Sequence, residues 1–409
     1  MNSPSNQLGF AISIITLLVL SFMSNDLFIP SMPQLSMDFH VSANAIQNAI
    51  TAWFFGSMSL QIVLGPISDQ YGRKPILLFS ACILIVASLI CALSSSVTGF
   101  LAGRFLQGLG VSGIMVTAFA ALHEVYEKQN NGTKILGMVG LCTALSPLAG
   151  PLIGAYVAIY FGWQANFYAI LLLGLPLVLI LAKYMPETIT HTPEHIDWVK
   201  IRKDYSTLFT NWTFTNTVAC YGMLFFAGGA FLAVVPFIFV DLLHWPIEYV
   251  GYGMMPMFIC YMLASSLAGK LEQQVKANTL IGISLTLLSL LMALFIGGSS
   301  HYESNGVFIL SALTAYYIGL GLIGPPLNNI SLSQASSENK GCASALLTVT
   351  MMLGSALGAS AISYFYDTHL FSIAAVIGGS IFVALAFFIL YFLKATTADK
   401  LSPAITENE

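Results

Sequence analysis

"PETITHTPEHIDWVKIRKDYSTLFT", residues 186–210, is the one long polar segment inside an otherwise apolar chain. Hydrophobic residues make up 57% of the sequence and charged residues 8%, whereas a soluble domain carries about 25% charged residues. Stretches of about 20 apolar residues, the length of an α-helix that crosses a bilayer, lie on both sides of this segment. The sequence therefore predicts a polytopic membrane protein.

Six apolar spans can be placed on each side of the polar segment. They cover 8–36, 46–66, 75–94, 97–126, 135–159, 163–185, 211–241, 247–269, 277–298, 306–335, 340–366 and 369–394. The predicted fold is an all-α membrane protein with twelve transmembrane helices in two pseudo-symmetric six-helix bundles. Its parts are an N-terminal bundle over 1–185, a cytoplasmic linker over 186–210, a C-terminal bundle over 211–394 and a cytoplasmic tail over 395–409.

The basic residues predict how the chain is oriented. All but one of the fourteen Lys and Arg residues fall in loops or tails that this count places on one side of the membrane. Because basic loops remain in the cytoplasm, we expect that side, the linker and both termini to be cytoplasmic. The opposite loops hold Asp241, Glu303 and Asp367 and carry no Lys or Arg.

Two charged residues interrupt the apolar spans, namely Asp26 in the first and Arg104 in the fourth. At 1.5 Å per residue, Asp26 lies about 27 Å from the start of its helix near residue 8, and Arg104 lies about 10 Å from the start of its helix near residue 97. Both positions fall in the outer half of the membrane. Charges inside a membrane usually pair with each other or face a wet cavity. We therefore expect Asp26 to pair with Arg104 in a functional site.

Each charge also has a simpler interpretation. Pro30 and Pro33 follow Asp26, so this acid could merely end the first helix near the outer headgroups. The long stem of Arg104 could carry its charge to the outer surface. Neither interpretation accounts for the other charge, and the paired interpretation accounts for both.

The two halves also share a pattern of small residues. Gly150 and Gly154 in the fifth span recur 204 positions later as Gly354 and Gly358 in the eleventh. Small residues four positions apart allow two helix backbones to approach closely. The repeat therefore predicts close helix packing at related places in the two halves, whereas the two membrane charges have no charged counterparts at the same offset.

Several motifs resemble those of the major facilitator superfamily. "GPISDQYGRKP" (65–75) is similar to its loop signature, in which an acid and a basic cluster latch the cytoplasmic ends of helices. "RFLQGLG" (104–110) resembles the fourth-helix motif of drug/proton antiporters, and "SPLAGPLIGAY" (146–156) resembles the fifth-helix motif of antiporters. Together with "NDLFIPSM" (25–32) and "MPET" (185–188), these stretches resemble MdfA-type multidrug exporters of the Bcr/CflA kind.

The resemblance implies roles for residues at matching positions. Asp26 would be the proton and substrate site. Phe22 and Asn25 would line the substrate pocket, and Arg104 and Gln107 would be their partners in the fourth span. The implied latch residues are Gly65, Asp69, Gly72 and Arg73, and the implied antiporter motif residues are Pro147, Gly150, Pro151 and Gly154.

The chain also departs from the family pattern. A second membrane acid, two turns before Asp26, is replaced by Leu18, so proton handling would depend on fewer groups. Gln70 stands where the loop signature usually has Arg after its acid, and Ala155 follows Gly154 where the fifth-helix motif ends in two glycines. The last two departures weaken the latch assignment slightly and leave the implied fold unchanged.

The substrate pocket is expected to be apolar and aromatic, with few polar groups. Helical spacing adds Ile50 from the second span and Val139, Thr143 and Pro147 from the fifth to the expected lining. Such stripes fit plain helix packing equally well.

Exchange of a proton for a substrate at Asp26 would give transport. A substrate that contacts Asp26 or disturbs its pairing with Arg104 would favour proton loss, and an arriving proton would favour substrate release. We therefore expect a proton-coupled antiporter that exports amphipathic small molecules by alternating access across a bacterial-type inner membrane. A metabolite or siderophore transporter of the same fold, or a non-transporting receptor, remains an open alternative.

Other classes of protein are not indicated. No P-loop lysine motif occurs, which disfavours transport driven by ATP. We expect no enzymatic activity, no metal or other cofactor and no binding of nucleic acid. The expected partners are small amphipathic substrates, protons and the lipid bilayer, and the expected state is a monomer.

Overall fold

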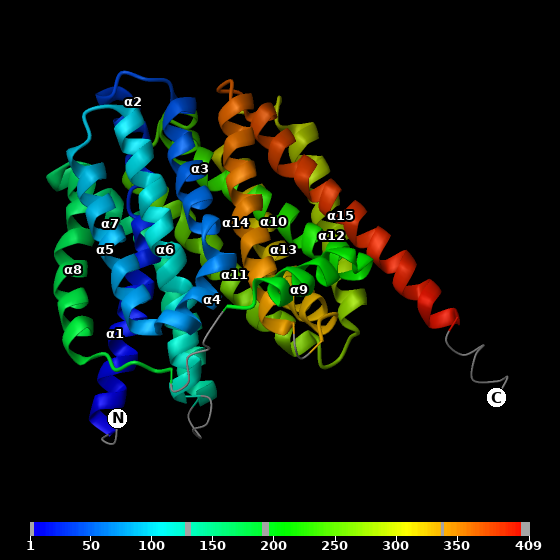
Figure 1. The fold of residues 1–409 in the computed structure, drawn as a ribbon. Coiled ribbons are helices and arrows are strands. Elements are labelled where there is room, and N and C mark those ends of the chain that lie inside the picture. Colours follow the sequence, from blue (N-terminus) through cyan, green and yellow to red (C-terminus); the bar gives the residue numbers. More distant parts are fainter. Residues whose placement is uncertain (1–3, 127–131, 190–195, 337–338, 402–409) are drawn as a thin grey trace. The chain divides into compact units, whose positions relative to one another are not determined.

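The computed structural model describes residues 4–126, 132–189, 196–336 and 339–401 (Figure 1). These residues form helices joined by short connections, with no strand among them. Eleven helices are long and apolar enough to cross a membrane, and the number rises to 12 when one bent helix pair counts as a single span. The predicted class, an all-α membrane protein, is confirmed.

By their contacts, the residues group into two units. The first comprises Met1–Ile196, Leu232–Met255 and Ile362–Tyr364, and the second comprises Asp197–Phe231, Pro256–Ala361 and Phe365–Glu409. The predicted bundle boundaries at 185 and 211 stay a prediction.

The first unit is built mainly from the N-terminal helices. They are α1 (Pro4–Asp26), the 3₁₀ turn η1 (Ile29–Ser31), α2 (Met32–Asp38), α3 (Ala43–Ser59), α4 (Gln61–Tyr71), α5 (Arg73–Leu93), α6 (Val97–Tyr126), α7 (Gly132–Phe161) and α8 (Gln164–Tyr184). α6 is central to this unit, because it packs against α5, α3 and α1, and α1 packs in turn against α7 and α8.

The first predicted span, 8–36, is a broken helix. α1 ends at Asp26, and the chain continues through η1 into α2. Pro30 and Pro33 explain the break, because proline lacks the N–H that a helix needs and its ring clashes with the preceding turn. The simpler interpretation of Asp26 is therefore right about the helix end. However, Leu27 and Leu35 after it are 5% and 0% exposed, so the break lies inside the packed unit.

The second predicted span, 46–66, is the bent pair α3 and α4. The two helices meet at Leu60 with an angle of 43° between them, and α4 continues to Tyr71, beyond the predicted end. Leu60 caps α4 with helical backbone angles, and Pro66 lies inside α4 without ending it. The latch motif thus begins on α4 itself and ends in the first turn of α5.

The second unit contains most of the C-terminal helices. They are α9 (Trp198–Thr210), α10 (Trp212–Phe237) with the π-helical turn η2 (Ile238–Leu242), α11 (Glu248–Leu271), α12 (Ala277–Gly298), α13 (Gly306–Ser333), α14 (Lys340–Phe365) and α15 (Leu370–Leu401). α10, η2, α11 and α14 also contribute residues to the first unit. α12 packs against α13 and α15.

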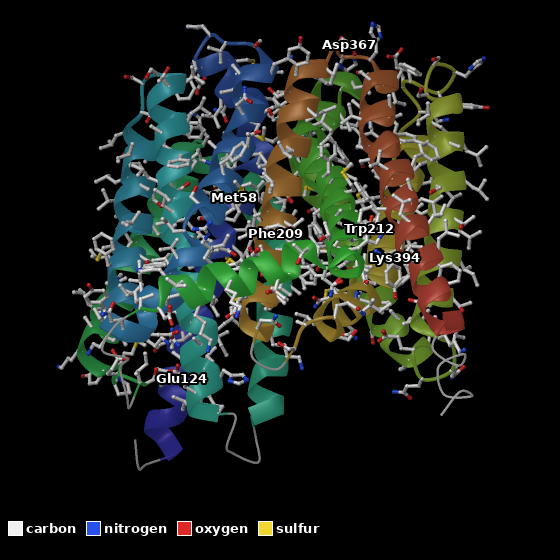
Figure 2. The ribbon with its side chains drawn as sticks, turned by 45° about the vertical axis from the view of Figure 1, so that its right-hand side comes forward. Met58, Glu124, Phe209, Trp212, Asp367 and Lys394 are labelled. Carbon is white, nitrogen blue, oxygen red and sulfur yellow. The ribbon has the colours of Figure 1, made fainter. Side chains whose placement is uncertain are left out.

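The predicted linker, 186–210, includes the helix α9, which the sequence analysis did not anticipate. The side chain of Asp197 caps it by accepting a 2.9 Å hydrogen bond from the N–H of Lys200. α9 lies across the direction of α10 and α14 (Figure 1), and Asn211 alone separates its last residue, Thr210, from Trp212 at the start of α10 (Figure 2 labels Phe209 and Trp212).

The repeated glycines bring helix backbones together in both units, as predicted. In the first unit, a Cβ added to Gly154 on α7 would overlap the carbonyl oxygen of Leu27 after α1. In the second unit, a Cβ added to Gly358 on α14 would overlap the carbonyl oxygen of Phe226 on α10. At the offset of 204, Phe226 corresponds to Phe22, five residues before Leu27, so the two approaches differ by about 1.4 helical turns.

A polar contact in the second unit joins the loop after α12 to the start of α15. Glu303 accepts a 2.9 Å hydrogen bond from His369 when Nδ1 carries the proton, and a 3.2 Å bond from the N–H of Leu370. The hydrogen bond with His369 lowers the pKa of Glu303, and the same contact, with help from the charge of Asp367, raises the pKa of His369.

This contact should be strongest between about pH 4.5 and 6.5, the ordinary pKa values of the two groups. The His369 contribution is present below its ordinary pKa and is lost as pH rises through its raised value. The Glu303 contribution is present above its ordinary pKa and is lost as pH falls through its lowered value. Glu303→Gln should lower the pKa of His369 in an NMR titration of the folded protein, and Glu272→Gln should leave it unchanged. An unchanged His369 titration in Glu303→Gln would contradict the assignment.

Candidate functional site

The two charged residues within the predicted spans, Asp26 and Arg104, lie near the end of α1. Asn25 and Asp26 are the last residues of α1, and Arg104 extends from α6. Asp26 is 7% exposed, Asn25 is 4% exposed and Arg104 is 0% exposed, so the site is closed off from solvent. A buried charge is costly unless it is paired or hydrogen-bonded, which makes the partners of each group decisive.

Arg104 is held by three oxygen acceptors. Nη1 donates to the carbonyl oxygen of Ser24 at 2.7 Å and to Oε1 of Gln107 at 2.6 Å, and Nη2 donates to Oδ1 of Asn25 at 2.8 Å. An uninterrupted helix would pair the Ser24 carbonyl with the N–H of residue 28, so the end of α1 makes this acceptor available. The guanidinium also lies 4.0 Å from the ring centroid of Phe28, a cation–π contact.

The predicted direct pair of Asp26 with Arg104 is wrong. Among the described residues, no ion pair joins them. Asp26 instead accepts a 2.8 Å hydrogen bond at Oδ2 from Ser146 on α7 and a 3.3 Å bond at Oδ1 from Nδ2 of Asn25. Consecutive side chains leave a helix about 100° apart. Arg104 therefore meets the Asn25 side of α1, while Asp26 faces α7.

Asn25 links the two charges. Its oxygen accepts from Arg104, and its nitrogen donates to Asp26. The opposite amide orientation would place an NH₂ group against the guanidinium and an oxygen against the carboxylate, so the two charges fix this side chain in one orientation. The network is therefore a chain of Arg104, Asn25, Asp26 and Ser146 that crosses from α6 through α1 to α7.

A surrounding layer of polar side chains supports this chain. Nε2 of Gln107 donates to Ser88 on α5 at 2.8 Å, and Nε1 of Trp53 on α3 donates to Ser24 at 3.2 Å. Sequence reasoning found Gln107 but missed Ser24, Ser88, Ser146 and Trp53. The Nε of Arg104 is buried and has no hydrogen-bond partner in the described part of the chain, which leaves one donor of the guanidinium unused.

The antiporter motif on α7 forms the wall against Asp26. A Cβ added to Gly150 would lie 2.7 Å from the Cβ of Asp26, and the closest approach of the two helices continues at Gly154. Pro147 and Pro151 lie inside α7. These residues bring the α7 backbone close enough for Ser146 to reach the carboxylate.

The predicted pocket residues are only partly brought together. Asn25 and Gln107 join the network, and Phe22 lies about one turn before Asp26 on α1. Ile50 on α3 is fully buried. The side chains of Val139 and Thr143 lie outside the described residues, so the pocket role of these positions stays a prediction.

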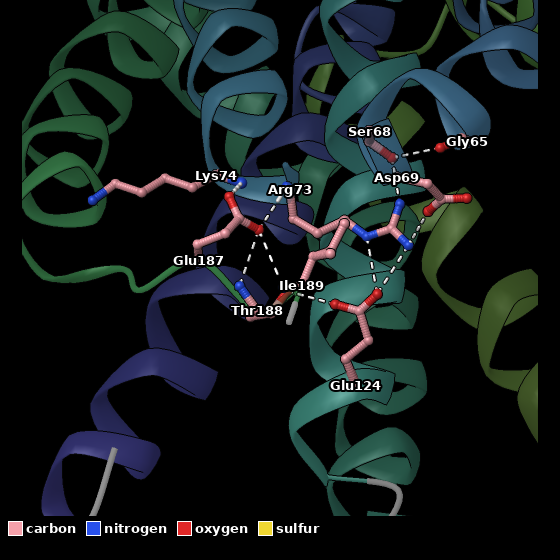
Figure 3. Close-up of polar contacts among 9 residues, drawn as sticks. All are labelled: Gly65, Ser68, Asp69, Arg73, Lys74, Glu124, Glu187, Thr188 and Ile189. Atoms are coloured by element: carbon pink, nitrogen blue, oxygen red, sulfur yellow. Dashed lines mark hydrogen bonds and ion pairs between the residues drawn. The ribbon is translucent and has the colours of Figure 1, made fainter. Parts of the chain in front are cut away.

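The implied latch residues form a second polar cluster (Figure 3), which we call the latch cluster: Ser68, Asp69, Arg73, Glu124 and Glu187. The guanidinium of Arg73 pairs with Asp69, hydrogen-bonds Ser68 and pairs with Glu124 of α6 at 2.9 Å. Of the two predicted glycines, Gly65 contributes its carbonyl oxygen, which accepts a 2.8 Å bond from Ser68.

Glu187, from the chain after α8, completes the latch cluster at the start of α5. It accepts hydrogen bonds from the N–H groups of Arg73 at 2.8 Å and Lys74 at 3.2 Å. These N–H groups have no partner within the helix, and the positive end of the helix dipole favours a carboxylate there. Gly72, the other predicted glycine, precedes them with a φ of 99°, a conformation that side-chain-bearing residues rarely adopt.

Glu187→Gln should therefore weaken the start of α5. The change keeps the shape of the side chain but removes the charge and one acceptor, and we expect the free energy of unfolding to fall by about 1 kcal/mol. Thermal unfolding of the purified protein in detergent would measure the change. Glu272→Gln is the matched control, because Glu272 makes one 3.5 Å contact to Asn329. Equal effects of the two changes would contradict the capping role.

A bundle of apolar spans with buried charges between its helices is the architecture of a membrane transporter. The sequence profile of the Major Facilitator Superfamily matches residues 14–359. The chain belongs to this superfamily and is a transport protein rather than an enzyme.

Relatives similar to the chain are named as a multidrug transporter or as drug-resistance proteins. "Multidrug transporter MdfA" of Yersinia pestis bv. Antiqua (strain Angola) is 28% identical over 364 residues, which cover 87% of this chain and 88% of that protein. "Multidrug resistance protein MdtM" of Escherichia coli (strain K12) is 24% identical, with 85% and 84% covered. The "Bicyclomycin resistance protein homolog" of Haemophilus influenzae is 27% identical, with 70% and 72% covered.

Solved structures share the fold at low sequence identity. A bacterial homolog of the human lysosomal transporter Spinster superposes with a TM-score of 0.74 at 13% identity, covering 97% of this chain and 98% of that one. A D-xylose-proton symporter superposes with a TM-score of 0.71 at 14% identity, covering 93% and 97%. At these identities the likeness establishes the fold alone.

Proposed function

We propose that the protein is a proton-coupled antiporter that exports amphipathic small molecules by alternating access. The observation that carries the proposal is the placement of Asp26, a buried carboxylate that accepts bonds from Ser146 and Asn25 and is in direct contact with no cation of the described residues. A carboxylate held by neutral donors can gain a proton without first breaking an ion pair. This property suits a group that must load and unload protons during each cycle.

Asp26 can exchange its proton against a substrate. In the charged state, both carboxylate oxygens accept hydrogen bonds. After protonation, one oxygen becomes a donor, and the hydroxyl of Ser146 can reverse its bond and accept from it. A cationic or hydrogen-bond-donating substrate would stabilise the charged state, and a proton would displace it. Competition at one group then couples the two movements.

Arg104 acts in this scheme as a positioning residue. It holds the Ser24 carbonyl and the oxygen of Asn25, and through Asn25 it fixes the donor that faces Asp26. Its positive charge balances the negative charge of Asp26 across a single amide. A change at either end therefore alters the bonds at the other, although the two charged groups do not touch.

A proton gradient and a membrane potential supply enough free energy to drive such an exchange. One pH unit supplies about 1.4 kcal/mol per proton, and 100 mV supplies about 2.3 kcal/mol per charge moved. Leu18, at the position of the second acid in related exporters, is fully buried and cannot ionise. The simplest cycle therefore exchanges one proton for one substrate molecule.

The substrate class rests on the relatives, whose printed names describe multidrug transport, multidrug resistance and bicyclomycin resistance. The function can be tested with the purified protein in vesicles, using a panel of fluorescent amphipathic cations and neutral dyes. Under a pH gradient, dye should move against its own gradient toward the acidic side, and adding dye without a gradient should release protons from the protein. Movement with the proton instead would indicate a symporter, and no movement would contradict transport of this class.

We also propose that both termini face the cytoplasm of a bacterial-type inner membrane, because the basic loops fall on one predicted side. In a cysteine-free background, Glu303→Cys should react with a membrane-impermeant maleimide added to whole cells, and Lys200→Cys should react only after the cells are opened. Both residues are partly or fully exposed, so accessibility within the protein does not limit the reaction. The reverse pattern would overturn the orientation.

A further inference from the structure

The helix α9 has one side that packs on the second unit. Leu208 is 2% exposed, and Ile201 and Tyr205, on the same side of the helix, are half-buried. Tyr205 hydrogen-bonds Cys342 in the first turn of α14. These contacts fix α9 against the start of α14, and they also determine which side of α9 faces outward.

The outward side of α9 is apolar and basic at once. Trp198 is 51% exposed, Val199 is 80% exposed and Phe209 is 63% exposed. Arg202 and Lys203 are also exposed on this outward side, while Lys200 and the half-buried acid Asp204 lie toward Cys342 of α14. Exposed aromatic and aliphatic groups interleaved with cations are typical of helices that lie at a membrane surface, where apolar groups enter the bilayer and cations meet anionic lipids.

The end of α9 reaches an apolar hollow on the spans. Phe209 lines this hollow with Phe214 and Val218 of α10 and Leu346 of α14. α10 and α14 are both long and apolar enough to cross the membrane. Val218 lies six residues inside α10, about 9 Å along the helix, so the apolar hollow extends along an apolar span from the end of α9.

A polar hollow lies next to the apolar one on the same helix. It is lined by Val199, by the cations Arg202 and Lys203, and by Ser206, Thr207 and Thr210. The guanidinium and the ammonium together suit a phosphate group. The hydroxyls of Thr207 and Thr210 donate to backbone carbonyl oxygens of α9, so the two cations carry the recognition. Near the same end of α9, the ammonium of Lys394 lies 5.3 Å from the ring centroid of Trp212, which adds a further positive charge (Figure 2).

We propose that this side of α9 is a binding site for an anionic phospholipid. The phosphate headgroup lies at Arg202 and Lys203, and an acyl chain follows Phe209 into the apolar hollow between α10 and α14. The adjacency of the polar and apolar hollows points to a molecule with both parts, and the surplus of cations selects an anionic headgroup over a neutral one. The site is separate from Asp26 and does not depend on the proposed transport function.

Photocrosslinking in lipid nanodiscs would test the site. Benzoylphenylalanine in place of Phe209 keeps an aromatic ring at the apolar hollow, and the full chain is reconstituted with equal amounts of phosphatidylglycerol and phosphatidylcholine. Mass spectrometry then gives the ratio of the two crosslinked lipids. We expect strong preference for phosphatidylglycerol, and Arg202→Gln with Lys203→Gln should reduce it by about 30-fold, roughly fivefold for each cation near the surface.

Matched controls separate this site from general charge effects. Lys270→Gln with Lys276→Gln removes two exposed cations, one from the last turn of α11 and one from the loop before α12, and should leave the preference unchanged. Inorganic phosphate at 20 mM, compared with chloride of equal ionic strength, should also leave it unchanged. Absence of lipid crosslinks, equal crosslinking of both lipids, or loss of the preference with phosphate alone would each overturn the proposal.

Discussion

Asp26→Asn is expected to abolish concentrative export while the protein still folds. Asparagine keeps the size of the side chain and can still bond Ser146, but it cannot carry a proton at any ordinary pH. The wild type should build a dye gradient of about tenfold per pH unit for a one-to-one exchange of a neutral dye, and the variant should build none. Flux measurements in vesicles with pH gradient and membrane potential set independently would show this difference.

The matched control for this experiment is Asp241→Asn, the same substitution at an exposed acid near the end of another span. It should leave the dye gradient unchanged. Asp26→Asn should still exchange dye down a dye gradient, because the proposed alternating access does not require a change in the charge of this side chain. A normal pH-driven dye gradient in Asp26→Asn would remove the basis of the proposed coupling.

Gly154→Ala is expected to have a large effect on folding. The added methyl group would occupy the space of the Leu27 carbonyl oxygen, so α1 or α7 must move as a whole helix. Overpacking of a core costs about 1–3 kcal/mol, and a backbone neighbour that cannot rotate away places this case at the upper end. The unfolding midpoint of the detergent-purified protein should fall, and transport should fall with it because Ser146 and Asp26 would separate.

Gly379→Ala on α15 is the control for that change. A Cβ added there meets nothing within 4 Å, so this substitution should leave stability unchanged or raise it by about 0.5–1 kcal/mol, the gain from removing a flexible glycine from a helix. If both substitutions lowered the unfolding midpoint equally, the close approach of α1 and α7 would not be the cause.

The sequence predicted the membrane fold well because span length and composition leave few alternatives. It did not predict the breaks within the spans. The break after Asp26 had a visible signal in Pro30 and Pro33, although the chain remains buried beyond it. The bend at Leu60 had no comparable signal, because Leu60 is neither proline nor glycine and the bend depends on packing against other helices.

The residues of the candidate site were predicted only in part, because the sequence reveals charged residues but not the direction of their side chains. Charges in apolar spans are conspicuous, so Asp26 and Arg104 stood out at once. Depth along a helix, however, does not say which way a side chain points, and the predicted pair failed because Asn25 rather than Asp26 faces α6. Ser146 could not be identified from sequence, since serines in such helices often bond to their own backbone, as Ser57 does here.

The helix α9 was not predicted from the sequence for a different reason. Its segment is polar in composition, and the sequence analysis therefore treated it as a connection. Ile201, Tyr205 and Leu208 nevertheless follow helical spacing, and this weak apolar stripe is the side that packs on the protein. The apolar stripe was not recognised because the outward side of the helix is also partly apolar. The contrast between the two sides of the helix is therefore weak in the sequence.

The position of Glu187 has a consequence for how the protein is made. Glu187 follows Arg73 by 114 residues, yet it caps the helix that Arg73 begins, and its neighbour Thr188 donates a 2.5 Å hydrogen bond to Glu124. During synthesis at the ribosome, α4, α5 and α6 are therefore translated before Glu187, the last member of the latch cluster. The latch cluster therefore cannot be complete until the sixth span, α8, and the residues after it have been synthesised. Its completion is a late step in the assembly of the protein.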